Sequence, residues 1–337
     1  MRVVAITGPK TCELVEKPDP QAAEDIVVVK IHAIPMCTEY KAYVRGGESD
    51  CFGHEAAGEV VEVAQPGKVA VGDRVVVMPH SPCGKCAHCL AGEYIHCESG
   101  VDLLAVTGSK AGTATYAEFC LKQDWLLLPI PDGMSIDHAS MACCGLGPTF
   151  GAMQRMNVGA GDTVLIAGLG PVGLGGVIAA AWRGARVIGV EGIAYRADLA
   201  RRLGASDIVE PGDGALDAIR DLTGGAGVDK AVDCSGAEPA QRLIIDALRR
   251  RGQMCFVGEG GDLTVTVSRD MIRKGLTLHG QWHWNLADTP KMMKLIAESG
   301  EKLDTLITHT FPMEQVQDAW ELQAAGHCGK IILHPWE

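Results

Sequence analysis

Short apolar runs separated by turn residues dominate the first part of the chain. Residues 26–29 and 75–77 are runs of branched apolar side chains, and Gly72-Asp73 is a turn signal between them. Runs of this length, bounded by Gly, Pro and Asp, are typical of strands in an all-β arrangement. From Val3 to about Val77 the pattern therefore predicts a β-rich, partly barrel-like domain.

After Pro148 the pattern changes to strands that alternate with helices. Apolar runs at 164–167 and 187–190 predict buried strands, residues 228–234 continue the alternation, and the segments between them have helical length. This alternation predicts an α/β domain with a parallel, doubly wound sheet. A helix near 290–299 and a final strand at 331–333 suit a chain that returns to the first domain. We therefore expect two domains, one built from 1–147 with 286–337 and the other from 148–285.

Length and charge restrict the function. At 337 residues the chain exceeds the size at which one core usually stops growing. Its 30 basic and 42 acidic residues give a net charge of -12, which repels nucleic acid and anionic lipid. No window reaches the roughly 18 apolar residues of a spanning helix, and the N-terminus resembles a strand rather than a signal peptide. We expect a soluble, cytoplasmic protein with no membrane or nucleic-acid partner.

Four of the 13 cysteines share a metal-binding spacing. Paired thiolates two residues apart are typical of tetrahedral zinc with four sulfur ligands. The alternatives are a disulfide cluster or unrelated thiols, but three cysteines spaced by two residues are too close for relaxed pairwise bridges. An odd cysteine count also fits a reducing compartment. The spacing predicts a closed, structural zinc site at Cys83, Cys86, Cys89 and Cys97.

A glycine-rich turn follows the first strand of the predicted α/β domain. Gly168, Gly170 and Gly173 have the spacing at which a backbone turn approaches a pyrophosphate at a helix N-terminus, as in Rossmann folds. Glu191 ends the next strand, where a carboxylate can accept hydrogen bonds from the adenosine ribose. It would repel a 2'-phosphate, so NAD is favoured over NADP. Arg196 could instead reach such a phosphate or stack near the adenine.

A second metal site is suggested by scattered soft ligands. Cys37 follows a predicted strand, Gly53-His54-Glu55 comes about one hairpin later, and Cys143 and Cys144 precede the α/β domain. Two cysteines and one histidine form a catalytic zinc site that leaves one position open. Taken singly, each of these residues is more often a core side chain than a ligand.

Together these motifs resemble the zinc-containing medium-chain dehydrogenase/reductase family over essentially the whole chain, near its sorbitol and threonine dehydrogenase branch. The matching pieces also include residues 72–75 and 233–236. The resemblance implies a GroES-like catalytic domain, a Rossmann domain, two zinc ions per chain, NAD(H) in the interdomain cleft, and a dimer or tetramer. It implies catalytic zinc on Cys37, His54 and Cys144, since residues 150–151 then fall at the family's aromatic-glycine spacing. The resemblance also implies that Glu55 is a catalytic carboxylate beside the zinc that can ligate it transiently. The implied cofactor-binding residues are Gly168, Gly170, Pro171, Val172, Gly173, Glu191, Arg196, Ser235 and Val257.

The sequence departs from the family after Cys37. Members usually carry a Ser or Thr two residues after this cysteine, which relays the alcohol proton, and then an Asp that supports the zinc histidine. Here these positions hold Glu39 and Tyr40. We expect Glu39 to take part in proton transfer, with Thr38 as an alternative hydroxyl and direct zinc ligation by Glu39 as another. The alternative without function is a carboxylate turned to solvent.

The substrate is expected to be a small alcohol or its ketone. Trp282, Trp284 and Asn285 fall where family members approach the nicotinamide and the substrate, although tryptophans also pack subunit interfaces. Such a lining, with Glu39, suits a polyol, cyclitol or sugar derivative. The alternatives are oxidation of an amino alcohol, as in threonine dehydrogenase, and a homologue that binds but no longer turns over.

Overall fold

The computed structural model describes residues 1–337 and divides them into two compact units. The first unit comprises Met1–Gly145, Asn285–Glu298 and Ile307–Glu337, and the second comprises Leu146–Trp284 and Ser299–Leu306. One difference from the expected division is the segment Ser299–Leu306, which we had placed in the first domain. It forms α11 (Gly300–Leu306), which buries Leu303 and Leu306 and packs on α6 (Pro171–Trp182) and α7 (Ala194–Leu203) of the second unit.

The first unit is built around a seven-stranded sheet with the order β14-β15-β3-β4-β5-β7 and β6 paired with β3. Its central strand, β3, is almost wholly buried, because branched apolar residues fill both faces. The final strand, β15, pairs antiparallel with the end of β3, so the C-terminal segment completes this sheet. A separate two-stranded sheet pairs β1 with β2. The strands of the unit are β1 (Arg2–Gly8), β2 (Thr11–Glu16), β3 (Ile26–Pro35), β4 (Ala56–Glu62), β5 (Arg74–Val77), β6 (Phe119–Gln123), β7 (Leu127–Pro129), β14 (Ile307–Pro312) and β15 (Lys330–His334).

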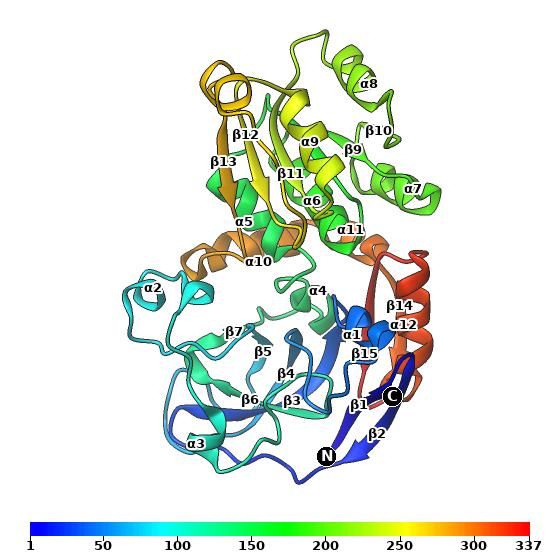
Figure 1. Ribbon diagram of the computed structural model, residues 1–337. Helices are drawn as coiled ribbons and strands as arrows, with labels where there is room; N and C mark the ends of the chain where they lie inside the picture. The colour runs from blue at the N-terminus through cyan, green and yellow to red at the C-terminus, as the bar shows by residue number, and fades with distance from the viewer. The chain divides into compact units, whose positions relative to one another are not determined.

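Short helices connect these strands (Figure 1). The longest of them, α10 and α12, have ten residues each. The helices are α1 (Tyr40–Arg45), α2 (Ala87–Leu90), η1 (Tyr94–His96), α3 (Leu103–Thr107), η2 (Asp124–Leu126), α4 (Ile136–Ser140), η4 (Leu286–Asp288), α10 (Thr289–Glu298), η5 (Met313–Gln315) and α12 (Val316–Ala325).

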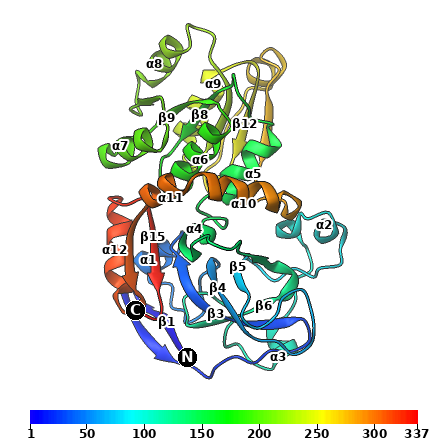
Figure 2. The same cartoon turned by 180° about the vertical axis from the view of Figure 1, so that it is seen from behind.

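The second unit is a six-stranded parallel sheet with the order β10-β9-β8-β11-β12-β13. This confirms the expected doubly wound α/β fold: α6 packs on α7 and α11, while α8 packs on α9, and the views from the two sides show helices on both faces of the sheet (Figures 1 and 2). The remaining elements are α5 (Gly147–Arg155), β8 (Thr163–Ala167), β9 (Arg186–Val190), β10 (Asp207–Val209), α8 (Ala215–Leu222), β11 (Val228–Asp233), α9 (Glu238–Ala247), β12 (Leu248–Phe256), the π-helix η3 (Val267–Ile272) and β13 (Thr277–Gly280).

No helix in the chain combines the length and the apolar character needed to cross a bilayer.

Candidate active site and metal centres

The four-cysteine lobe spans residues 83–97 and contains α2 and η1. Asn285 holds the turn between α2 and η1, because its side-chain amide donates to the Ala91 carbonyl and to the Glu93 carboxylate, both at 2.9 Å. Gly92 lies between these partners with a φ of 81°, and a Cβ there would come within 2.2 Å of the Asn285 side-chain oxygen. Only glycine fits this turn without displacing Asn285. Asn285, which we had expected near the substrate, thus supports the lobe.

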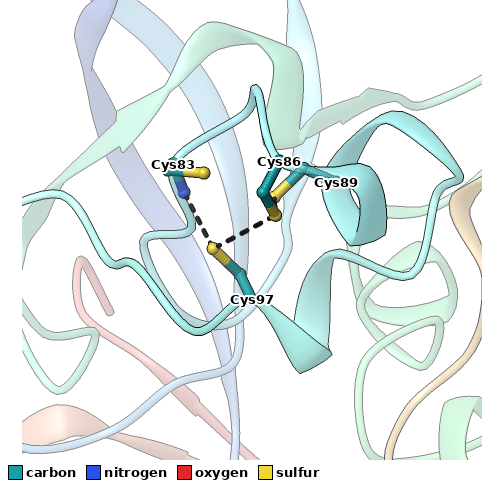
Figure 3. Close-up of side chains that lie close together, drawn as sticks. All are labelled: Cys83, Cys86, Cys89 and Cys97. Carbon is teal, nitrogen blue, oxygen red and sulfur yellow. Dashed lines mark hydrogen bonds between the residues drawn. The ribbon is translucent and has the colours of Figure 1, made fainter.

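The four thiols of the lobe converge on one point (Figure 3). The sulfur atoms of Cys86 and Cys89 are 3.5 Å apart and those of Cys86 and Cys97 are 3.9 Å apart. A tetrahedron with zinc–sulfur bonds of 2.3 Å has edges of about 3.8 Å, whereas a disulfide requires about 2.05 Å. The spacing of these sulfurs therefore fits a shared zinc ion and excludes disulfide bonds among them.

Backbone donors favour the thiolate form in this lobe. The amides of Lys85 and Cys86 hydrogen-bond to Cys83 and lower the pKa of that thiol to about 6. The Ser99 amide donates to the Cys97 sulfur at 3.4 Å. Since metals bind the thiolate rather than the thiol, these donors support a metal site rather than four unrelated cysteines.

A second cluster brings together Cys37, His54, Glu55 and Cys144, whose ligand atoms all lie within 4.8 Å of one another. Cys37 comes just after β3, His54 and Glu55 just before β4, and Cys144 a few residues after α4. The His54 Nε2 and Cys144 Sγ atoms are 3.2 Å apart, near the roughly 3.5 Å edge of a tetrahedral zinc site with one nitrogen and one sulfur. The Cys143 thiol instead points to the Val77 carbonyl, at 3.4 Å.

A buried ion pair lies beside this cluster. Lys330 on β15 donates to both oxygens of Glu55, at 2.9 and 3.1 Å, and both side chains are 1% exposed. The Cys144 amide donates to Glu55 as well, at 3.0 Å. Burial raises the pKa of Glu55 to about 7 although Lys330 opposes this shift. Lys330 thus fixes the Glu55 carboxylate next to the candidate metal ligands, and each of the two buried charges is paired with the other.

Glu39 faces the cluster and is not turned to solvent. Its side chain is only 8% exposed, and one oxygen lies 2.8 Å from His54 Nδ1. The other oxygen accepts the Cys37 amide at 3.1 Å and is 3.5 Å from the Tyr116 hydroxyl. Thr38 is exposed. Proton transfer by Glu39 or Thr38 stays a prediction.

The charges in this cluster favour metal binding. The contact with Cys144 lowers the pKa of Cys37 well below its usual value despite burial, so Cys37 is poised as a thiolate. Burial by itself lowers the pKa of His54, but hydrogen bonds to Cys37 and Glu39 raise it to about 11. A metal ion bound at Nε2 would therefore displace a proton from this ring. The cluster holds two thiols, one imidazole and two carboxylates in close contact. A divalent cation would offset the negative charge of the carboxylates and of the Cys37 thiolate.

The glycine turn of the second unit lies between β8 and α6, as the sequence predicted. A Cβ at Gly173 would come within 2.0 Å of the Gly168 carbonyl oxygen, so helix and turn approach more closely than any other residue permits. Gly170 precedes the helix, and Pro171 and Val172 form its first turn. The free amides at this N-terminus suit a pyrophosphate.

Glu191 follows β9 and faces the same turn. One of its oxygens accepts the Leu169 amide at 2.9 Å, and the other accepts the amides of Gly192 and Ile193. The carboxylate is thus fixed next to the glycine turn. Arg196 is nearby, because its Nη1 atom lies 4.0 Å from the position of a Cβ on Gly170.

Ser235 has a structural role in this unit. Its hydroxyl donates to the buried Asp233 at 2.7 Å and accepts the Ala237 amide at 3.1 Å. The Val257 amide donates to the Asp233 carbonyl at 2.9 Å. Asp233 therefore contacts both segments that carry expected cofactor residues, one after β11 and the other after β12.

The two tryptophans expected near the substrate differ in exposure. Trp282 is 43% exposed, whereas Trp284 is 1% exposed and packs edge-to-face on Phe150 with ring centroids 5.9 Å apart. Trp284 is therefore a core residue in this structure. Trp282 lies partly at the surface of the unit.

Three supporting residues were missed from the sequence: Lys330, Gln323 and Tyr116. Gln323 of α12 donates to the Cys37 carbonyl at 2.6 Å. Only Lys330 could have been found from the sequence. It begins an apolar strand, and a buried charge there needs a partner of opposite charge. Nothing local marks Gln323 or Tyr116, because each meets the cluster only through the folded chain.

Comparison with known proteins identifies both units. An alcohol dehydrogenase GroES-like domain matches residues 23–132, and a zinc-binding dehydrogenase domain matches residues 171–298. An L-threonine 3-dehydrogenase of Caldanaerobacter subterraneus is 30% identical, covering 96% of this chain and 95% of its own. A sorbitol dehydrogenase of Bacillus subtilis is 29% identical, covering 99% and 97%.

Among solved structures, the alcohol dehydrogenase TADH of Thermus sp. ATN1 has the same fold. Its TM-score is 0.88 over 99% of both chains, at 22% sequence identity. The fold, the family domains and the full-length relatives agree with the expected resemblance. The chain belongs to the zinc-type medium-chain alcohol dehydrogenases and is a zinc-dependent oxidoreductase.

Proposed function

We propose that this protein interconverts a secondary alcohol and its ketone with NAD(H), using one catalytic zinc ion, while a second zinc ion stabilises the four-cysteine lobe. The observation that carries this proposal is the convergence of Cys37, His54 and Cys144 beside the buried Glu55. Zinc held there supplies Lewis acidity to a substrate oxygen. The four thiols of the lobe leave no position for a substrate.

Other residues of the chain would support the zinc ligands and bind the dinucleotide. Glu55 and Lys330 place a fixed ion pair behind the ligands. The turn at Gly168–170 and the N-terminus of α6 bind the pyrophosphate of the dinucleotide. The Glu191 carboxylate has about four acceptor sites. Three of them accept backbone amides, so about one remains for a ribose hydroxyl. The charge of Glu191 disfavours a 2'-phosphate, so NAD is preferred over NADP.

For the substrate we propose a polyol, cyclitol or sugar derivative. The similarity to a sorbitol dehydrogenase supports this class, as do the carboxylates near the proposed zinc site and the exposed Trp282. The second candidate is an amino alcohol, which the similarity to an L-threonine 3-dehydrogenase favours. We further propose that the protein acts as a homodimer or homotetramer in the cytoplasm.

NADH absorbance separates these candidates. The purified protein is assayed with NAD and NADP against sugar alcohols, cyclitols and threonine, and with NADH against the matching ketones. We expect turnover with a polyol or its ketone, and at least tenfold higher kcat/KM with NAD. Turnover with threonine alone would favour the second candidate. Full zinc occupancy without turnover on any alcohol or ketone would contradict the proposal.

A further inference from the structure

Glu39 contacts two different ligand-bearing loops at once. One oxygen meets His54 Nδ1 at 2.8 Å, and the other accepts the Cys37 amide at 3.1 Å. A carboxylate without a proton can only accept hydrogen bonds, so its contact with His54 places a proton on Nδ1. When Nδ1 alone carries the proton, Nε2 presents its lone pair, and Nε2 is the atom that lies 3.2 Å from the Cys144 sulfur.

The Glu39 side chain is held in this position by its surroundings. It is 8% exposed, and the Tyr116 hydroxyl approaches its second oxygen at 3.5 Å. Tyr116 is in turn packed against Phe52 and Trp320, with ring centroids 5.0 and 5.6 Å away. A Cβ on Gly53, the residue before His54, would clash with the Tyr116 ring at 2.4 Å. The loop that carries His54 therefore packs directly on the residue that backs Glu39.

The Cys37 peptide is fixed from both sides. Glu39 accepts its N–H, and the Gln323 side chain on α12 donates to its carbonyl at 2.6 Å. Glu39 thus links this peptide to the Nδ1 side of the His54 ring. We propose that Glu39 is a positioning residue that locks Cys37 and His54 into one ligand geometry and fixes the tautomer of His54. This inference rests on the proposed metal ligation but not on the proposed substrate.

The expected effect is a loss of metal affinity at one site only. Partners that orient a metal ligand typically change metal affinity about 10- to 100-fold. Glu39→Ala should therefore raise the dissociation constant of zinc at the Cys37, His54 and Cys144 site by about that factor. Glu39→Gln should recover most of the loss, because its amide oxygen still accepts from His54 Nδ1 although its nitrogen cannot accept the Cys37 amide.

The test is a chelator-competition titration of the full-length protein with Zn²⁺, without substrate or nicotinamide. The four-thiolate lobe is an internal reference, and its zinc content together with the melting temperature reports folding. The matched control is Glu48→Gln, an exposed carboxylate of the same segment. A Co²⁺-loaded sample adds a spectroscopic readout, because the visible bands of cobalt report the ligand field at the open site.

We expect weakened zinc binding and altered cobalt bands for Glu39→Ala, partial recovery for Glu39→Gln, and no change for Glu48→Gln. Unchanged zinc affinity and cobalt bands for Glu39→Ala would overturn positioning and leave proton transfer as the role to test. Equal losses of affinity in Glu39→Ala and Glu39→Gln would overturn it in favour of direct ligation by the carboxylate. Loss of zinc from both sites in a destabilised chain would reduce Glu39 to a general folding role. Because zinc affinity and cobalt bands alone decide for or against positioning, failure of the proposed activity leaves the test intact.

Discussion

The two cysteine-rich clusters of the first unit are assembled in different ways. The lobe collects its four sulfurs from residues 83–97, so its geometry is set by local turns. The other cluster draws on residues 37, 54 and 144 and is backed by Lys330, so it exists only after the sheet has closed around β3 and β15. The lobe needs only four cysteines that are close in sequence. The cluster of Cys37, His54 and Cys144, called the distant cluster below, depends on buried charges to keep its ligands in place. The difference predicts that one cluster governs stability and the other governs turnover.

The largest effect is expected at Cys144. Cys144→Ser removes a thiolate from the distant cluster, and losing several kcal/mol of transition-state stabilisation lowers kcat by about 10³-fold or more. Its neighbour provides the control: Cys143→Ser keeps a hydrogen bond to the Val77 carbonyl and should retain turnover within about threefold. Steady-state kinetics on both variants make the comparison, and the reverse ranking would show that Cys143 is the ligand.

The lobe should show the opposite behaviour. Cys97→Ser removes one of four thiolates from a closed site, and structural zinc contributes several kcal/mol or more to folding. We expect the melting temperature to fall by about 10 °C, at a few degrees per kcal/mol for a domain of this size. Turnover per folded chain, measured well below the transition, should stay within about threefold. A loss of turnover without a loss of stability would break the distinction between the clusters.

Breaking the Lys330–Glu55 ion pair should lower the free energy of unfolding by less than loss of the lobe zinc does, but still by several kcal/mol. Lys330→Met leaves Glu55 buried without its partner, which typically costs about 3 to 5 kcal/mol. Chemical denaturation measures this loss. The double variant Lys330→Met with Glu55→Gln removes both charges and should recover part of the free energy of unfolding. If the double variant is as unstable as the sum of the two single ones, the pair is not coupled.

The smallest effect concerns the support of the lobe. Gly92→Ala introduces a Cβ within 2.2 Å of the Asn285 oxygen at a φ of 81° and should cost about 1 to 3 kcal/mol. Gly108→Ala has a similar φ of 72° but meets nothing within 4 Å, so it isolates the backbone strain. Denaturation curves should show the larger loss for Gly92→Ala. Equal losses would mean that Asn285 adjusts without cost.

Sequence spacing predicted the local features better than the distant ones. The lobe thiols and the turn at Gly168 follow from short motifs, because neighbours in sequence fix their geometry. The contact between Glu39 and His54 did not follow, since the position of Glu39 in the chain suggested a relay while its side chain is aimed at the ring. Likewise, Lys330 meets Glu55 only through strand pairing across the whole first unit. Trp284 looked like a substrate contact, but its apolar ring is buried on Phe150.

Zinc content tests the central claim most directly. Elemental analysis of protein purified without chelator should return two zinc ions per chain for the unaltered protein. It should return one for Cys144→Ser and one for Cys97→Ser, because each change empties a different cluster. A ratio of one in the unaltered protein, or loss of both ions from either variant, would contradict two independent zinc sites.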